Sequence, residues 1–336
     1  MARNPSAARQ PALSDVAALA GVSHMTVSRV INGGSVGRDT RHRVLAAIEE
    51  LGYRPNPAAR ALATGRSRTL GVVGLDSVLY GPASTLFGIE NAARESGYGI
   101  SIASAGSQDQ DSIADGVESL RGQGVAGIVV IAPHVATQSA PAPLDIPMVV
   151  VADTSKTAVP VVAVDQRHGA RRVTEHLLAL GHSTVWHVGG PRDWLEARTR
   201  EEAWRSVLTE RGARVPPVVR GDWSPRSGYE AGRALVAEKE VEAVFVANDQ
   251  MALGVLRAFS EAGVSVPDDV HVAGFDDVPE AAYFSPPLTT VRQDFLALGR
   301  MTFAHLRMML EGESPPTVSK VPAELIVRDS TGLGRI

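Results

Sequence analysis

From Thr69 to about residue 330, short apolar runs alternate with longer amphipathic stretches, and this alternation constrains the fold more than any other feature. The short runs are typical of buried strands, and the stretches between them are typical of helices. Regular alternation of the two favours parallel, doubly wound sheets with helices on both faces. We therefore predict an α/β body over residues 69–330.

The expected strands of this body fall into two successive series. The first series contains Leu70–Leu75, Gly99–Ala103, Gly127–Ala132, Met148–Ala152 and Val161–Val164. The second contains Thr184–Val188, Val218–Gly221, Ala243–Ala247, Val270–Phe275 and Thr289–Val291. Helices are expected near residues 83–96, 109–122, 166–180, 195–211, 225–238, 249–262 and 295–311. Two series predict two similar lobes, with the chain crossing between them near residues 160–165 and again near residue 290.

The first seventy residues carry a charge opposite to that of the rest of the chain. They hold ten Arg, no Lys and four acidic residues, a net charge of +6, whereas the remaining residues carry a net charge of −10. A compact basic segment attached to an acidic body is typical of a nucleic-acid-binding head. Basic arms also occur without this role, so the charge needs a motif to support it.

A helix-turn-helix pattern lies within this basic segment. Ser14 is expected to cap a first helix that Gly21 ends, and Ser23 to cap a second helix that stops near residues 32–34. The i, i+3, i+4 spacing predicts an inward face that packs on the first helix, formed by Val27, Val30 and Ile31 against Val16, Leu19 and Val22. The outward face is expected to carry His24, Met25, Ser28, Arg29 and Asn32. Such a face can reach base edges in a major groove, although a solvated polar face has the same pattern.

A third helix and a short fourth one are expected after this motif. Asp39 or Thr40 is the expected cap of the third helix, and Gly52 its end. Asn56 followed by Pro57 is a helix start signal, but the segment after it has little apolar surface. A hinge that becomes helical only on DNA is therefore a reasonable hypothesis. The expected organisation is a flexible arm (1–12), a DNA-binding head (13–54), a hinge helix and linker (55–68), an effector-binding and dimerisation domain (69–330) and a tail (331–336).

The head and hinge resemble those of the LacI/GalR family of transcriptional repressors. The resemblance is carried by Leu13-Ser14-Asp15-Val16-Ala17, Ala20-Gly21-Val22-Ser23, Thr26-Val27-Ser28-Arg29-Val30-Ile31-Asn32 and Gly52-Tyr53-Arg54-Pro55-Asn56. It implies that His24, Met25 and Arg29 read bases and that Ser23, Thr26, Ser28 and Asn32 contact phosphates. It also places Leu62 and Ala63 where the hinge of the family enters the minor groove.

Polar and aromatic residues follow several of the predicted strands. These are Asp153, Asp165, Asn248-Asp249, Asp276-Asp277, Gly221-Asp222-Trp223 and Gln293-Asp294-Phe295. Ligands bind at the carboxyl ends of strands in open α/β sheets, and carboxylates, amides and aromatic faces together suit a sugar. A single Asp at a strand end is more often a helix cap, and Asp249 in particular has the position of a helix N-terminal acid.

The resemblance extends over the body as well. It is carried by Glu175-His176-Leu177, Leu180-Gly181-His182, the run 246–254 and Gly274-Phe275-Asp276-Asp277, with Gly221-Asp222-Trp223-Ser224, Pro286-Pro287-Leu288-Thr289-Thr290 and Gln293-Asp294-Phe295 similar to the lactose-repressor branch. It implies a small all-α helix-turn-helix head joined to an α/β, two-lobed, periplasmic-binding-protein-like body with parallel sheets. The implied effector-binding residues are Leu79, Pro82, Asp153, Arg200, Trp223, Asn248, Asp276, Gln293 and Phe295. Without the resemblance, Arg200 reads equally well as a solvated helix residue.

Several classes of function have no support in the sequence. The chain has no Cys, no nucleotide-binding glycine loop and no G-x-S-x-G elbow, and the spacing of His182 and His187 favours a structural role. We therefore expect no enzymatic activity, no metal and no cofactor. The N-terminus lacks the apolar core of a secretory signal, and no run of 18 apolar residues predicts a membrane span, so a cytoplasmic protein without a membrane partner is expected.

The sequence therefore predicts an allosteric, sequence-specific regulator that binds double-stranded operator DNA. The expected form is a repressor that a sugar, possibly galactoside-like, releases from its operator. The absence of a terminal heptad helix favours a homodimer. A non-sugar corepressor such as a purine, or a sugar-binding protein, are the alternatives.

Overall fold

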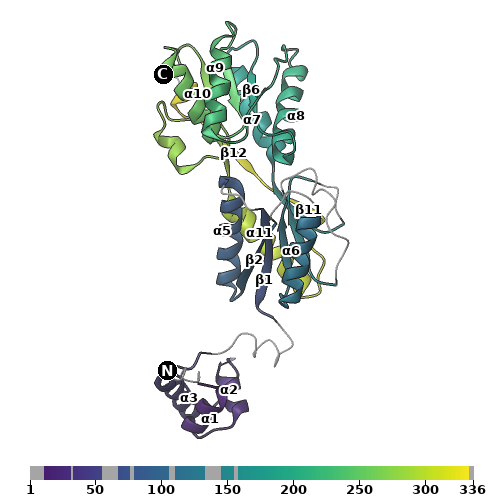
Figure 1. The fold of residues 1–336 in the computed structure, drawn as a ribbon, viewed down its shortest axis with the longest axis vertical. Helices are drawn as coiled ribbons and strands as arrows, with labels where there is room; N and C mark the ends of the chain where they lie inside the picture. Colours follow the sequence, from purple (N-terminus) through teal and green to yellow (C-terminus); the bar gives the residue numbers. More distant parts are fainter. Residues whose placement is uncertain are drawn as a thin grey trace, which may run out of the picture. The chain divides into compact units, whose positions relative to one another are not determined.

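The fold was analysed in a computed structural model (Figure 1). It describes residues 11–31, 33–54, 67–75, 79–105, 110–132, 145–154 and 158–332. The chain folds as two compact units, residues 1–68 and residues 69–336. Both parts of the predicted fold class are present, a small helical unit and a two-lobed α/β body with parallel sheets.

The described residues of the N-terminal unit form three helices: α1 (Leu13–Ala20), α2 (His24–Ile31) and α3 (Arg38–Leu51). They enclose a small core of Val and Ala side chains that includes Val16, Val27, Val30 and Val44. Leu19, expected to point inward, is 47% exposed. The prediction was wrong because α1 buries Val16, Ala17 and Ala20, and this stripe leaves Leu19 on the solvent side of the helix.

The helix starts differ from the predicted ones at two of these three helices. In α1 the cap position is Ala12, whose backbone N–H donates to the Asp15 carboxylate at 2.7 Å, so Ser14 lies inside the helix. In α3 the cap position is Gly37, ahead of Asp39 and Thr40, and no side chain caps the helix. For α2 the prediction is confirmed, since the backbone N–H of Thr26 donates to Ser23 Oγ at 3.2 Å.

The body contains two parallel sheets. The first has the order β11-β5-β4-β3-β1-β2 and comprises β1 (Thr69–Leu75), β2 (Gly99–Ala105), β3 (Ile128–Ile131), β4 (Met148–Val151), β5 (Val161–Val164) and β11 (Val318–Val321). The second has the order β7-β6-β8-β9 and comprises β6 (Trp186–Gly189), β7 (Val219–Arg220), β8 (Ala243–Val246) and β9 (His271–Ala273). The helices α5 (Tyr80–Glu95), α6 (Gln110–Gly122) and α11 (Phe295–Leu310) belong to the first lobe, and α7 (Gln166–Ala179), α8 (Leu195–Glu210), α9 (Pro225–Val236) and α10 (Asp249–Glu261) to the second.

The two lobes are joined by three described passages of the chain: from β5 into α7, from β10 (Thr290–Gln293) into α11, and from β11 into β12 (Ala323–Ile326). The third passage was not predicted. The sequence assigned residues 289–291 to the second parallel series, yet β10 pairs with β12 in an antiparallel ladder and touches the second sheet through isolated bridges. The strands β11 and β12 are four residues long with few fully buried positions, so their apolar signal is weak.

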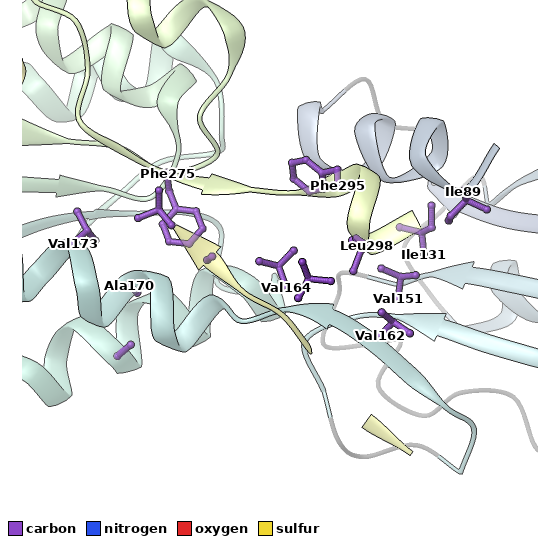
Figure 2. Close-up of a cluster of buried hydrophobic side chains, with 14 of the residues drawn as sticks. Ile89, Ile131, Val151, Val162, Val164, Ala170, Val173, Phe275, Phe295 and Leu298 are labelled. Carbon is purple, nitrogen blue, oxygen red and sulfur yellow. The ribbon is translucent and has the colours of Figure 1, made fainter. Parts of the chain in front are cut away.

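One apolar core runs through the junction of the lobes. Figure 2 shows Val162 and Val164 of β5, Phe275 after β9, and Phe295 and Leu298 of α11 as parts of this single cluster. Because the cluster includes residues of both sheets, the lobes share buried surface rather than meeting only through connecting chain.

The helices α9 and α10 approach each other through glycines. A Cβ atom built on Gly228 would lie 2.1 Å from the carbonyl oxygen of Met251, and one built on Gly254 would lie 2.0 Å from that of Pro225. No methyl group fits at these backbone distances, so the contact requires glycine at both positions.

We predict that Gly228→Ala lowers the free energy of unfolding by about 1–3 kcal/mol, because the helices must separate. The control is Gly122→Ala, at the end of α6 with open space around it, which should leave stability unchanged or raise it by about 1 kcal/mol. Urea unfolding of both variants measures the difference. Equal stability of the two variants would contradict the close packing.

Candidate functional site

A cavity of about 310 Å³ lies in the body, with walls from both lobes. Every residue that the sequence proposed for effector binding lines it. From the first lobe come Leu79, Pro82, Asp153 and Phe295, and from the second come Arg200, Trp223, Asn248, Asp276 and Gln293. The structure thus brings together nine residues from eight different parts of the chain, as expected at the carboxyl ends of parallel strands.

A hydrogen-bonded network centred on Arg200 forms the floor of the cavity. Arg200 Nε donates to Gln166 Oε1 at 2.9 Å, and one terminal nitrogen donates to the Ala247 carbonyl at 2.5 Å. Gln166 Nε2 donates to Gln293 Oε1 at 2.7 Å, and Gln293 Nε2 donates to Asp276 Oδ1 at 2.6 Å. Arg200 is 4% exposed, so the alternative of a solvated helix residue is excluded.

The charges of this network are balanced at close range. The second terminal nitrogen of Arg200 lies 3.7 Å from Asp276 Oδ1, and its guanidinium stacks 3.9 Å from the ring centre of Phe275. Burial raises the pKa of Asp276 to about 6, although Arg200 and the Gln293 hydrogen bond act in the opposite direction. A carboxyl held in this way can change its charge near neutral pH.

Aromatic rings form the apolar walls. Trp223 is 6% exposed and meets Trp194 edge to face at 5.5 Å, and its ring lies against Gly190, where a Cβ would approach to 2.3 Å. Phe295 meets Tyr80 edge to face at 5.7 Å. These contacts hold the rings in place without a ligand, which lowers the entropy lost on binding.

Backbone strain is concentrated at the site. Among the described residues, the non-glycine positions with positive φ are Trp223 (75°), Asp276 (115°) and Asp277 (53°). Such conformations cost about 1–3 kcal/mol each and persist where the surroundings enforce them. Two of the three residues line the cavity, which indicates that their side-chain directions matter more than local stability.

Asn248 has a structural role in addition to its place in the cavity wall. Its Oδ1 accepts the backbone N–H of Met251 at 2.9 Å and caps α10. Its Nδ2 donates to the Trp223 carbonyl at 3.1 Å and to Gln250 Oε1 at 2.9 Å. Both N–H groups of the Asn248 side-chain amide are therefore hydrogen-bonded within the protein. Asn248 thereby fixes the loop that carries Trp223.

Other polar residues at strand ends lie outside the cavity lining. Asp165 caps α7 and Asp294 caps α11, each by accepting a backbone N–H. Asp277 pairs with Arg292 and Arg328, both at 2.7 Å. Asp249, expected to be a helix N-terminal acid, is the first residue of α10 and is fully buried, where it accepts from Thr290 Oγ1 and the Val278 N–H. The cap interpretation thus fits Asp165 and Asp294, whereas Asp277 and Asp249 are engaged in contacts with other parts of the body.

Further lining residues were not found from the sequence, among them Tyr80, Gln166, Trp194, Glu196 and Gln250. Glu196 and Arg200 lie one helical turn apart on α8, a spacing that places two side chains on one face. Gln166 directly follows the strand-end residue Asp165. Both signals were present, but neither separates a cavity residue from a surface residue without the fold.

The outward face of α2 is a second candidate site. His24, Met25 and Arg29 are exposed, and Met25 is 68% accessible. Ser23 is exposed, whereas Thr26 and Ser28 are partly buried. Three predicted DNA-contacting residues, Asn32, Leu62 and Ala63, lie outside the described residues. The described members lie in α2 or directly before it, and each is at least partly exposed.

Comparison with known proteins identifies the type of domain in both parts of the chain. Residues 12–56 match the family model described as bacterial regulatory proteins, lacI family, and residues 174–331 match a periplasmic binding protein-like domain. The lactose operon repressor of Escherichia coli K12 is 33% identical over 328 residues, 95% of this chain and 90% of that protein. The chain belongs to the lacI family of bacterial regulatory proteins.

Two further relatives show the range of this lacI-family fold. The repressor PurR of Haemophilus influenzae is 32% identical over 95% of this chain and 98% of its own length. A structure of the lac repressor dimer bound to operator and the anti-inducer ONPF superposes with a TM-score of 0.88, at 32% identity, over 96% of this chain and 99% of that one. A structure of the regulator CelR with cellobiose superposes with a TM-score of 0.71, at 33% identity, over 95% of this chain and 99% of that one. These relatives are regulators rather than enzymes.

The described residues of this lacI-family chain contain neither a membrane-spanning helix nor a cluster suited to a metal ion. No described helix combines the length and apolarity that a bilayer crossing requires. Within the same ranges, no three His, Asp or Glu side chains gather closely enough to hold a metal ion.

We predict a pH dependence that Asp276 controls. A buried acid whose pKa is raised by folding costs stability when it ionises, so stability falls as pH rises through about 6. The variant Asp276→Asn cannot ionise. Its unfolding free energy relative to wild type should therefore rise by about 1–2 kcal/mol between about pH 5 and pH 8. Calorimetry at both pH values measures the change, with Asp268→Asn on an exposed turn as the control. A difference that does not vary with pH would refute the assignment.

Proposed function

We propose that this regulator is a transcriptional repressor whose cavity binds a sugar and whose α2 helix reads an operator. The observation that carries the sugar assignment is the composition of the cavity. Carboxylates (Asp153, Asp276) and an amide (Gln293) can pair with hydroxyl groups, and Trp223 and Phe295 can cover the apolar face of a ring. The CelR structure contains cellobiose in a related fold, which supports a sugar in this one.

The two lobes provide a route from ligand to DNA. A sugar that contacts Asp153 in the first lobe and Arg200 in the second ties the lobes together at the passages of the chain between them. The bound form would then hold the lobes at one angle, and a homodimer would transmit that angle to its two heads through residues 55–68. The ligand acts only through its different affinities for the two states, which are typically worth about 1–3 kcal/mol.

The DNA half of the proposal rests on α2. His24, Met25 and Arg29 would reach base edges, and Ser23, Thr26, Ser28 and Asn32 would contact phosphates. Leu62 and Ala63 would enter the minor groove. The lactose repressor structure contains operator DNA in the same fold, and the basic charge of the first seventy residues favours a polyanion. Because it would act on operator DNA, the proposed location of this repressor is the cytoplasm.

We predict that Arg29→Ala weakens binding to the specific operator by roughly 10- to 100-fold, since one base-reading contact is worth about 1–3 kcal/mol. Fluorescence anisotropy with a duplex selected from random sequences measures the loss. Affinity for non-specific duplex should change far less, and Arg226→Ala, on the exposed face of α9, should retain operator affinity. A uniform loss on all duplexes would show that Arg29 contacts phosphate instead of bases.

We predict that Trp223→Ala abolishes the response to the sugar and leaves operator affinity without sugar unchanged. The ring forms a wall of the cavity, whereas the head folds as a separate unit. Operator binding is titrated with and without a panel of neutral mono- and disaccharides and, as the alternative, purine bases. If the variant unfolds because the ring is largely buried, Trp223→Leu keeps an apolar side chain there. An unchanged sugar response in a folded variant would remove Trp223 from the site, and a response to purines alone would replace the sugar.

A further inference from the structure

Three polar atoms that line the cavity have no hydrogen-bond partner in the described part of the chain. They are Asp153 Oδ2, Glu196 Oε2 and Trp223 Nε1. The Asp153 side chain is 8% exposed and Trp223 is 6% exposed, so bulk solvent hardly reaches either group. Unpaired buried polar atoms destabilise a protein, and a cavity lined with them is suited to a ligand that satisfies them.

The cations of the site are already engaged elsewhere. Arg200 donates to Gln166 and Ala247 and lies beside Asp276, and its guanidinium is stacked on Phe275. Lys320 lies 3.6 Å from both Asp153 and Asp165 and is 40% exposed, so solvent screens it. No ion pair to Glu196 is present among the described residues. Two acceptors therefore remain, and the positive charge that would suit an anionic ligand is used up.

The two acceptors come from different lobes. Asp153 follows β4 of the first lobe, and Glu196 is the second residue of α8 in the second lobe. Burial raises the pKa of Glu196 to about 7, and the charge of Asp153 acts in the same direction. The two carboxylates thus repel each other across the cavity while it holds no ligand.

We propose that Glu196 is a further effector-binding residue and forms with Asp153 an acceptor pair that bridges the lobes. A ligand with hydroxyl or ammonium donors satisfies both carboxylates, removes their repulsion and draws the two walls together. The same pair excludes sugar phosphates and uronic acids. This inference rests on the proposed function, that a sugar occupies the cavity, and it specifies the charge of that sugar.

The pair makes binding depend on pH in a defined direction. Donors bind the ionised carboxylate more tightly, so affinity rises as Glu196 loses its proton between about pH 6 and pH 8. The charged groups that act on Glu196 are Asp153, Asp276 and Arg200, with Lys320 acting through Asp153. Asp276 also titrates near this range. The pH dependence of affinity that is due to Glu196 is therefore the difference in pH dependence between wild type and Glu196→Gln.

The test is a thermal-shift screen of the full chain followed by calorimetry. The panel contains neutral sugars (glucose, galactose, lactose, cellobiose), amino sugars (glucosamine, galactosamine) and anionic sugars (glucose 6-phosphate, glucuronate, galacturonate). The best wild-type ligand should be neutral or cationic. Glu196→Gln should weaken it by roughly 10- to 100-fold, as expected for hydrogen bonds to a charged group, and should remove most of its pH dependence. The control Glu202→Gln changes an exposed residue of the same helix and should retain wild-type affinity.

Three outcomes overturn the proposal. The first is that an anionic sugar is the best ligand. The second is that Glu196→Gln binds the best ligand as tightly as wild type does. The third concerns the protein without ligand. An unsatisfied carboxylate predicts that Glu196→Gln has a higher melting temperature than wild type at pH 8, and that this increase in melting temperature is smaller at pH 5. A lower melting temperature of the variant at pH 8 would show that Glu196 is structural. If no sugar binds while this stability gain is observed, the sugar effector fails and the unpaired acceptor stands.

Discussion

The buried guanidinium of Arg200 is the interaction on which the arrangement of the body most depends. A cation that is 4% exposed must be compensated locally, because its desolvation is costly. Its partners come from α7, the end of β8 and the segment after β9, and Gln293 of β10 completes the network. Elements distant in sequence therefore have to converge on one point, and the cavity forms above that point. The network satisfies its own members, which leaves the remaining polar atoms of the cavity for a ligand.

The same region is where the lobes share their core. Val164, Phe275, Phe295 and Leu298 pack in one cluster beside the passages of the chain between the sheets (Figure 2). Packed cores have discrete arrangements rather than a continuous range, and this cluster borders the cavity through Val164, Phe295 and Leu298. Strained backbone at Trp223 and Asp276, unpaired acceptors on both walls and a shared core together describe a site held ready for a ligand at some cost in stability.

The role of each strand-end carboxylate illustrates how far prediction from sequence reaches. Asp153, Asp165, Asp276 and Asp294 all follow apolar runs, and the sequence treats them alike. In the structure Asp165 and Asp294 cap helices, whereas Asp153 and Asp276 line the cavity. The resemblance named Asp153 and Asp276 but not Asp165 or Asp294 as effector-binding residues, a division that the local pattern does not make. Glu196 shows the opposite case, since its charge and its position on the helix are visible in the sequence, while the lack of a hydrogen-bond partner for its Oε2 is not.

By itself, the sequence determined the helix-turn-helix head, the alternation of strands and helices, and most helix bounds, because these follow from the period of apolar residues and from glycines such as Gly21 and Gly52 that end helices. Tertiary structure alone decided the antiparallel pairing of β10 with β12, the burial of Asp249, the exposure of Leu19 and the presence of Asp153 and Glu196 in the lining of one cavity. The physical reason is that pairing, burial and electrostatic compensation depend on residues far apart in the chain, which no local pattern records.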